Sequence, residues 1–506
     1  MKYLFAALLV LLVVASLGLR MSFPDLQAHR PVMYWVTDAN PARELQVETF
    51  HKWLEKHGHV DEEGEPLVEL RLDTGSSDTT KKVIQSVSGV AGDLMDTTGE
   101  SMRLLQAMGV VADLTDDAEQ MGFDVEQTYE AIRPALTLNG RQYRYPANVA
   151  ASMLWVNVDT LRRFGLEPPP SRWTWDDFEE LGIKFKEAAN PPGTPAFARR
   201  FLAADLWSML MIRSAGISLY NETMTASGLD DPRYVDMLAT KYRWIYELNI
   251  LPTPDDRDAF SSAQGYGGAS LQLFNSGQYA MVSGGRYMLI QLRRFENLGE
   301  LKVVEPPYRE LPTTIIASRA VVLYAGSKYP ELAKLFLSYL ASEDYNQLII
   351  QDADALPPNP RYTQSEAFLK PPDYPNEWEI HAPFVNAANT IAIGKSLSPY
   401  ILPTETERSR QKFEDFVMTR QMTPEEAAAA TAREINATIA EEVSRKPELQ
   451  DAYEADLKRQ KRINELKDLG QPIPKSLITN PFHLSYYEQK GMLVDDTPAA
   501  ETPEQN

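Results

Sequence analysis

Buried strands and amphipathic helices alternate along the first part of the chain, and this alternation limits the folds open to it. PVMYWV at residues 31–36 is short and apolar, as buried strands are, and LVELRLDT at residues 67–74 alternates apolar with polar side chains. Between them, Val47, Phe50 and Leu54 recur at helical spacing. A strand, a helix and a second strand form a βαβ unit, which predicts a parallel sheet and an α/β fold.

A second cycle of strands and helices follows in the middle of the chain. MLWVN at residues 153–157 predicts a strand, and the apolar stripe of residues 327–348 predicts one helix with Pro330 in its first turn. Residues 422–447 predict a further helix with Thr423 as its N-cap. Because 506 residues exceed one ordinary core, the two cycles predict two lobes.

The N-terminus, MKYLFAALLVLLVVASLGLR, is predicted to be an export segment. Lys2 supplies the positive charge, and residues 3–19 carry none. That apolar length suits either a cleaved signal peptide or a retained signal anchor, and both remain open. In either case the rest of the protein is exported, to the periplasm or the outer face of the cytoplasmic membrane. The chain has no cysteine, so the N-terminus has no Cys to lipidate.

Charge and cysteine content exclude several classes of function. The chain carries 71 acidic and 50 basic residues, a net charge of −21, whereas phosphate backbones need a basic face. We therefore expect no nucleic acid partner. Without cysteine the chain has no disulfide, no Cys-ligated zinc and no thiol catalysis.

Four stretches share one family's pattern of glycine, proline, tryptophan and apolar positions. They are VAGDLMDTTGESMRLLQAMGVVADL (90–114), NGRQYRYPANVAASMLWVNVDTLRRFGLEPPPSRWTWDDFEEL (139–181), LFNSGQYAMVSGGRYM (273–288) and YPELAKLFLSYLASEDYNQLIIQDADALPPN (329–359). The four stretches occur in the same order as in the family, and on this basis the chain resembles the extracellular solute-binding proteins of bacterial ABC importers, in the class that binds sugars and related polar solutes. Gly92 stands where the family has proline, and Arg286–Tyr287 where it has tryptophan.

The resemblance implies an α/β, two-lobed, periplasmic-binding-protein-like (type II) fold with an interlobe cleft, plus a C-terminal helical extension. It implies a monomeric carrier rather than an enzyme, with no cofactor and no metal. Such a carrier holds a small-molecule solute in the cleft and delivers it to an ABC permease in the cytoplasmic membrane. Strands that cross between the lobes would act as the hinge for closure.

Six segments are expected along the chain on this basis. The last of them is set apart because it is polar and ends in DDTPAAETPEQN, a composition typical of disorder. The segments are a signal peptide or anchor (1–24), an N-terminal lobe (25–148), a C-terminal lobe (149–311), a return to the N-terminal lobe (312–356), helices of the C-terminal lobe (357–447) and a polar helical and disordered tail (448–506).

Candidate ligand-binding residues lie in the loops that follow the predicted strands, where ligands of open α/β sheets bind. Arg286 is expected to clamp a hydroxyl pair or an anion, and its glycine neighbours to admit close approach of the backbone. For Trp35 a core position remains open, as helix capping does for Asp38 and Thr98. The candidates are Trp35, Thr37, Asp38, Ser76, Ser77, Asp96 and Thr98 on one lobe, and Asn148, Gly284, Gly285, Arg286 and Tyr287 on the other.

The remaining aromatic residues are assigned to packing. In SRWTWDDF, Thr174 is expected to cap a helix whose neighbouring tryptophans, Trp173 and Trp175, are structural. Trp207 and Trp244 lie on helical stripes and are predicted to be core.

Two other functions remain open at this point. An exported glycoside hydrolase would use a pair of carboxylates. The acidic residues of this chain are too numerous for the sequence to show which two would form that pair. A membrane-tethered interaction protein could have kept the fold and lost its ligand. His51, His57 and His59 do not share one helical face and are expected to be surface residues rather than metal ligands.

Overall fold

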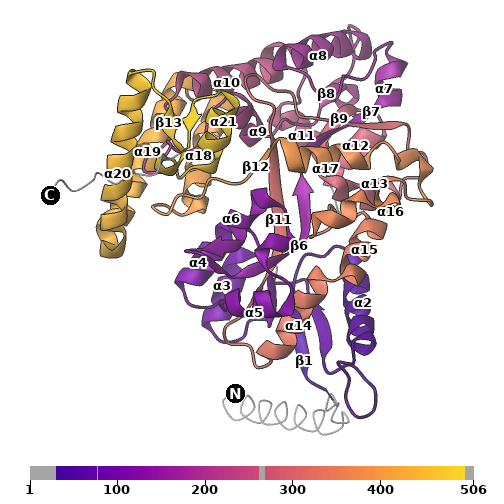
Figure 1. Cartoon of the computed structure of the whole chain (residues 1–506). Coiled ribbons are helices and arrows are strands. Elements are labelled where there is room, and N and C mark those ends of the chain that lie inside the picture. Colours follow the sequence, from indigo (N-terminus) through magenta and orange to yellow (C-terminus); the bar gives the residue numbers. More distant parts are fainter. Residues whose placement is uncertain (1–29, 77, 261–267, 496–506) are drawn as a thin grey trace, which may run out of the picture.

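The computed structural model describes residues 30–76, 78–260 and 268–495. They form two α/β lobes joined by long strands, with C-terminal helices on the flank of one lobe (Figure 1). The predicted α/β, two-lobed architecture is confirmed. The predicted export segment, Ser77 and the predicted disordered end, residues 496–506, lie outside the described residues. Within the described ranges, no helix is both long enough and apolar enough to cross a membrane.

The N-terminal lobe is built on a six-stranded sheet. Strand β1 pairs in parallel with β2 and β3, and α2 (Ala42–Lys56) connects β1 to β2, so the predicted βαβ unit is confirmed. Strand β11 is antiparallel to β3 and also pairs with β6. The strands, in sheet order, are β12 (Ala392–Ile393), β11 (Thr314–Leu323), β3 (Leu94–Thr97), β1 (Val32–Val36) and β2 (Glu69–Asp73), with β6 (Arg144–Ala151) beside β11.

An aromatic core lies between this sheet and its helices. Trp35 and Phe50 both contact Phe336, with ring centroids 4.9 and 5.2 Å apart. The helix expected over residues 327–348 is two helices, because Ser342 has extended backbone angles and its hydroxyl caps the second helix at Tyr345. The other elements of this lobe are α3 (Thr79–Val87), α4 (Gly99–Ala107), α5 (Thr115–Met121), α6 (Arg133–Leu136), α14 (Pro330–Ala341), α15 (Glu343–Asp352) and the β4–β5 hairpin (Thr137–Leu138, Arg141–Gln142).

The C-terminal lobe surrounds a four-stranded sheet. Its first helix, α8 (Trp175–Ala189), begins at a capping box in which Thr174 and Asp177 satisfy each other's backbone N–H groups. Trp173, Trp175 and Trp244 are buried, as predicted. In sheet order the strands are β10 (Leu301–Val304), β7 (Met153–Asn157), β9 (Tyr279–Gly284) and β8 (Phe201–Ala203). The further helices are α7 (Val158–Arg163), α9 (Ser208–Ser214), α10 (Pro232–Tyr242), α11 (Pro254–Phe260), α12 (Gly268–Asn275), α13 (Leu289–Leu292), α16 (Glu366–Leu369), α17 (His381–Thr390), α18 (Pro403–Met418) and α19 (Pro424–Arg445).

Strands β6 and β11 join the lobes. They pair antiparallel along most of their length, with an irregular register between Arg319 and Ala320. Strand β6 continues through Ser152 directly into β7, so one extended segment belongs to both sheets. The expected lobe boundary, between residues 148 and 149, falls inside β6 and not in a loop.

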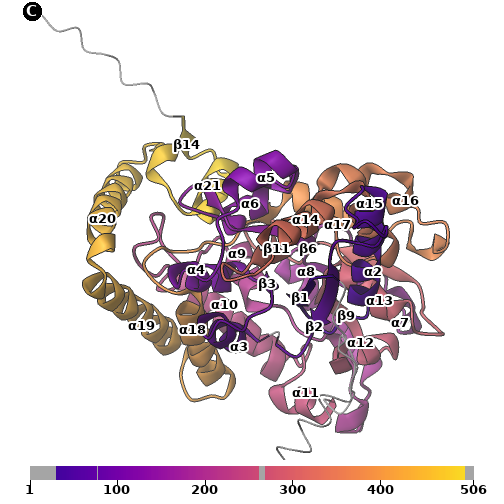
Figure 2. The same cartoon turned by 90° about the horizontal axis from the view of Figure 1, so that it is seen from below.

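The chain after α19 forms what we call the C-terminal module: α20 (Pro447–Asp468), β13 (Ile473–Pro474), α21 (Pro481–Gln489) and β14 (Leu493–Val494). Figure 2 shows α19 and α20 following one another along one side of the molecule. Helix α20 is polar, as expected, but the segment after it is folded and not a tail. Phe482, Tyr486 and Tyr487 bury one face of α21 against Leu311 and Ile393.

Candidate ligand-binding cleft

Two connected cavities lie where the lobes meet. We call them the N-lobe chamber, of about 380 Å³, and the C-lobe chamber, of about 930 Å³. Thr98, Ala150, Tyr287 and Ala317 line both, so the chambers form one continuous cleft beside the strands that join the lobes. These volumes are in the range of sites that enclose small molecules.

Asp96, at the end of β3, organises the N-lobe chamber. Its two carboxylate oxygens accept hydrogen bonds from the indole of Trp35 (2.7 Å) and the hydroxyl of Thr37 (2.5 Å). Arg319 Nη1 donates to the same carboxylate over 2.8 Å, and Lys82 Nζ donates to the Asp96 backbone carbonyl over 2.6 Å. Asp96 is therefore fixed by groups from strands β1 and β11, from the loop after β1 and from helix α3.

A second carboxylate, Asp354, lies fully buried beside it. Arg43 Nη1 donates to Asp354 over 2.5 Å, Gln46 Nε2 donates over 3.0 Å, and Arg319 Nη2 lies 3.6 Å away. Burial alone would raise the pKa of Asp354, but Arg43 and Arg319 outweigh it and hold that pKa at about 2. Arg43 also pairs with Asp38 over 2.7 Å.

Positive and negative charges balance in this chamber. Its three cations, Arg43, Arg319 and Lys82, face three carboxylates, those of Asp38, Asp96 and Asp354. Apart from the pair of Arg43 with Asp38, the ion pairs join residues that are far apart in sequence. They link β11 to β3, and link both α2 and β11 to Asp354 after α15.

Several polar groups at the chamber wall have no hydrogen-bond partner among the described residues. Arg319 Nε, Arg319 Nη2 and the hydroxyl of Ser318 form no hydrogen bond with the part of the chain that the structure describes. The side-chain amide of Asn148, which lines the same chamber, forms none with those residues either. Buried polar groups are normally satisfied, so this set is suited to meeting hydroxyl groups of a bound molecule.

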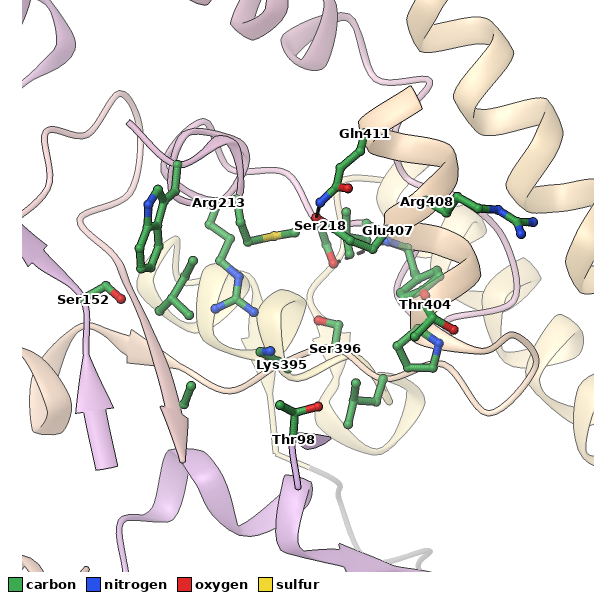
Figure 3. Close-up of a pocket in the computed structure, with 18 of the residues that line it drawn as sticks. Thr98, Ser152, Arg213, Ser218, Lys395, Ser396, Thr404, Glu407, Arg408 and Gln411 are labelled. Atoms are coloured by element: carbon green, nitrogen blue, oxygen red, sulfur yellow. Dashed lines mark hydrogen bonds between the residues drawn. The ribbon is translucent and has the colours of Figure 1, made fainter. Parts of the chain in front are cut away.

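The C-lobe chamber is lined from three directions (Figure 3). Trp207, Met209 and Arg213 come from α9 and its start, Ser396 and its neighbours from the loop after β12, and a row of polar side chains from α18. The indole of Trp207 precedes the helix and is 37% exposed, a large aromatic surface open to the cleft.

Three of the four charges that α18 places at this chamber are paired with neighbouring residues. Glu407 pairs with Arg410, Arg408 with Glu405, and Lys412 with Glu434. In Figure 3 the guanidinium of Arg408 points away from the cavity.

Arg213 differs from these residues. It is 4% exposed, and its two Nη atoms donate to the carbonyls of Ile393 (2.7 Å) and Gly394 (2.9 Å). No carboxylate of the described residues pairs with it. Burial lowers the pKa of Arg213 to about 10, and the group is still cationic at neutral pH.

The C-terminal module supports the wall of the C-lobe chamber from behind. The buried amide of Asn480 donates to the hydroxyl of Ser218 over 2.9 Å and accepts from that of Ser396 over 2.6 Å. Both serines line the chamber. Asn480 also caps α21 at Phe482, so the module's helix and the chamber wall share one side chain.

The sequence matches the family described as bacterial extracellular solute-binding protein over residues 44–347, more than half of the chain. The chain belongs to this family. The assignment agrees with the resemblance inferred from the four sequence stretches.

Solved structures with the same fold support the architecture. An ABC substrate-binding protein from Listeria monocytogenes, in complex with cycloalternan, has 19% identity and a TM-score of 0.67, over 81% of this chain and 99% of that one. The GacH receptor of Streptomyces glaucescens has 17% identity and a TM-score of 0.64, over 81% and 99%. A solute-binding protein from Thermotoga lettingae, bound with α-D-tagatose, has 17% identity and a TM-score of 0.65, over 81% and 100%.

The structure of this solute-binding protein brings five predicted site residues to the cleft: Asp38, Asp96, Thr98, Asn148 and Tyr287. Asp38 pairs with Arg43, and Thr98 forms a capping box with Ser101 at α4, so the capping alternative holds for Thr98. Tyr287 lines both chambers and so lies at their junction.

Four predicted residues support the site from behind. Trp35 and Thr37 are fully buried and reach Asp96 from the core side, so they position it and do not line the cleft. An added Cβ at Gly284 would lie 2.0 Å from Met288 Sδ, and one at Gly285 would lie 2.7 Å from the Tyr287 ring. These glycines are required by local packing, which fixes where Tyr287 lies.

The structure corrects the expectation for Arg286 and places Ser76 away from the cleft. Arg286 is fully buried and donates to the carbonyls of Ala355 (2.9 Å) and Ile350 (3.0 Å). With its guanidinium committed to backbone carbonyls, Arg286 holds the end of α15 and does not clamp a ligand. Ser76 is buried beside Gln85, whose side-chain amide donates to its hydroxyl.

Sequence reasoning missed three prominent residues of the cleft. Trp207 was predicted to be core and is exposed there. Arg319 interrupts the apolar strand TIIASRAVVL, and Arg213 ends the apolar run SMLMI. A lone arginine in such a run is a usable signal, because burying it requires a specific partner.

Proposed function

We propose that this protein captures a sugar or a related polar solute in the interlobe cleft and delivers it to an ABC permease. The observation that carries the proposal is the pairing, within one cleft, of an exposed aromatic surface at Trp207 with unpartnered polar groups at Asn148, Ser318 and Arg319. A sugar presents an apolar C–H face and many hydroxyls, which need an aromatic platform and hydrogen-bonding groups.

Relatives with this fold support a saccharide. The three similar proteins described above bind cycloalternan, acarbose and α-D-tagatose, respectively. Family membership supports export and a permease partner. Each lobe supplies part of the cleft, so a solute that touches both favours the closed arrangement around β6 and β11.

The structure gives no support for a hydrolase. A glycosidase needs a carboxyl group whose pKa is raised, so that it can donate a proton. In the N-lobe chamber, the pKa of Asp354 is held at about 2, and Asp96 is bound by Arg319. Both carboxylates are used in ion pairs that hold the lobe.

Thermal unfolding of the full-length protein, kept in solution with a mild detergent, tests the proposal. The panel consists of mono- and oligosaccharides, polyol phosphates and peptides. A solute at 100 times its Kd stabilises the folded state by about 2.7 kcal/mol, and we expect a saccharide to do so. A folded protein that none of the panel stabilises would contradict the carrier function.

Two tryptophan variants then locate the site. We expect Trp207→Ala to weaken binding of that saccharide about tenfold, because the aromatic platform is lost. Trp378→Ala is the matched control, since Trp378 is 44% exposed and lines none of the cleft. Equal effects of the two changes would place the solute elsewhere.

A further inference from the structure

The C-lobe chamber contains a buried arginine, Arg213. Backbone carbonyls fix the orientation of its guanidinium, but no carboxylate of the described residues neutralises its charge. Arg213 lies in the last turn of α9, and Figure 3 shows its guanidinium directed into the cavity. It is 4% exposed, so little water solvates its charge.

Two backbone carbonyls fix the orientation of this guanidinium. A guanidinium has five N–H groups. The carbonyls of Ile393 and Gly394 accept from the two Nη atoms of Arg213 over 2.7 and 2.9 Å. The other N–H groups of Arg213 have no acceptor among the described residues. Arg213 therefore has free donors on a fixed planar group, the arrangement that binds carboxylate or sulfate oxygens in pairs.

The other charges at the chamber do not compensate Arg213. Glu407, Arg408 and Lys412 are each paired with a residue of opposite charge outside the cavity lining. The two remaining lining charges, Lys395 and Asp415, are of opposite sign, and neither is a partner of Arg213. Arg213 is thus a positive charge without a carboxylate partner among the described residues, within a protein whose net charge is −21.

Such a charge is costly to keep. An isolated buried cation loses its hydration, and burial lowers the pKa of Arg213 to about 10 because no carboxylate offsets that loss. Methionine or leucine would fill the same space without this cost. The cost is offset when a ligand brings the missing negative charge.

We propose that Arg213 binds an acidic group of the solute, and that the cleft therefore takes an acidic saccharide, one that carries a carboxylate or a sulfate ester. This proposal rests on the proposed function and adds the chemical class of the solute. Trp207 would contact the sugar ring while Arg213 binds the acid, since both come from the start and end of one short helix.

Matched pairs of ligands test the proposal. Calorimetric titration of the full-length protein would compare neutral oligosaccharides with uronate oligosaccharides of the same length and linkage, and with their sulfated forms. We expect an acidic member to bind about 10- to 100-fold more tightly than its neutral counterpart, the effect of a charged hydrogen bond. The uronate and sulfate arms show which acid group is recognised.

Three variants assign the preference to Arg213. We expect Arg213→Gln to abolish the preference, so that the acidic and neutral members of a matched pair bind with equal affinity, and Arg213→Lys to keep part of it. Arg445→Gln is the control, because it removes the same charge from a side chain that is 61% exposed on α19, outside the cleft. Circular dichroism and thermal unfolding without ligand verify that each variant is folded.

The outcomes separate this proposal from the function on which it rests. Neutral saccharides that bind as tightly as acidic ones overturn the acidic class and leave the sugar carrier standing. So does an Arg213→Gln variant that keeps the full preference. If non-saccharide acids bind and no saccharide does, the acidic-saccharide class fails and the carrier function stands with another solute. If nothing binds to the folded protein, both proposals fail.

Discussion

The two chambers of the cleft differ in whether their buried cations have counter-charges within the protein. In the N-lobe chamber Arg43, Arg319 and Lys82 are matched by three aspartates. In the C-lobe chamber Arg213 has carbonyls alone as partners. Charges that neutralise one another within the protein stabilise the fold, whereas a charge that the fold holds without a counterion is available to a ligand.

The walls of the two chambers are also supported differently. The N-lobe chamber depends on ion pairs between segments far apart in sequence, such as that between Arg43 and Asp354. The C-lobe chamber depends on neutral hydrogen bonds from Asn480 of the C-terminal module. The comparison predicts that removing a partner costs most in the first chamber.

Asp354→Asn is expected to have the largest effect. The change leaves Arg43 and Arg319 buried with less than their full counter-charge, and breaking a buried ion pair costs about 3–5 kcal/mol of unfolding free energy. The shift of the denaturation midpoint measures this cost.

Asp344→Asn is the matched control for that change. Asp344 pairs with Lys56, whose side chain is 64% exposed, and exposed pairs contribute at most about 1 kcal/mol. If both variants unfold at the same denaturant concentration, the N-lobe network does not stabilise the lobe in the way that we describe.

Asn480→Ala is expected to have an intermediate effect. It removes the N-cap of α21 and leaves Ser218 and Ser396 without their common partner, a loss of about 2–3 kcal/mol. Because these serines line the C-lobe chamber, solute affinity should fall as well. Equilibrium unfolding and titration with the same solute measure the two effects.

Asn389→Ala provides the comparison for the module. The side chain of Asn389 is exposed on α17 and forms no hydrogen bond with the described residues, so this change should leave both quantities unaltered. Full solute affinity in Asn480→Ala would show that the module stabilises the chain without shaping the chamber.

The sequence could predict which strands border the cleft, because the end of a strand is recognisable from the local sequence. Asp96 and Asn148 were placed from the strands that they follow or occupy, and both line the N-lobe chamber. The positions of Trp35 and Thr37 were predicted equally well, but they face the core, since the side of a strand that a residue faces near its end depends on the helices packed there.

Three arginines show what the sequence could not supply. Arg286 follows two glycines, a local pattern that suits a ligand-binding turn, yet its backbone acceptors are Ile350 and Ala355, more than sixty residues away. Arg213 and Arg319 look like interruptions of apolar runs, and both reach the cleft. Their roles depend on long-range partners, which no local pattern contains.

The module after α19 was mistaken for a tail for a related reason. Its apolar residues are spread over two helices and the segments between them, and they pack on one another, with Leu311 and Ile393 of distant segments completing the cluster. So small a core gives no long apolar run or stripe in the sequence, and it is stable only against the rest of the protein.

Asp352→Asn repeats the comparison of balanced and unbalanced charge on the smallest scale. Asp352 lies two residues from Asp354, but one of its oxygens has no hydrogen-bond partner among the described residues. Burial and the neighbouring Asp354 raise the pKa of Asp352 to about 6, from 3.8. Between those two pH values the folded state holds more protons than the unfolded state, so this residue's contribution to stability decreases as pH rises.

The neutral asparagine should therefore stabilise the protein at pH 7 and not at pH 4. Because Asp352 is partly exposed, we expect a gain of about 1 kcal/mol at pH 7, with solvent screening reducing it below the full effect of the pKa shift. Denaturation midpoints at the two pH values measure it, with Asp373→Asn, at an exposed position, as control. A gain that is equal at both pH values would mean that the charge of Asp352 does not cause it. The fold would then tolerate the carboxylate of Asp352, which has no ion pair among the described residues, as well as that of Asp354, which lies between Arg43 and Arg319.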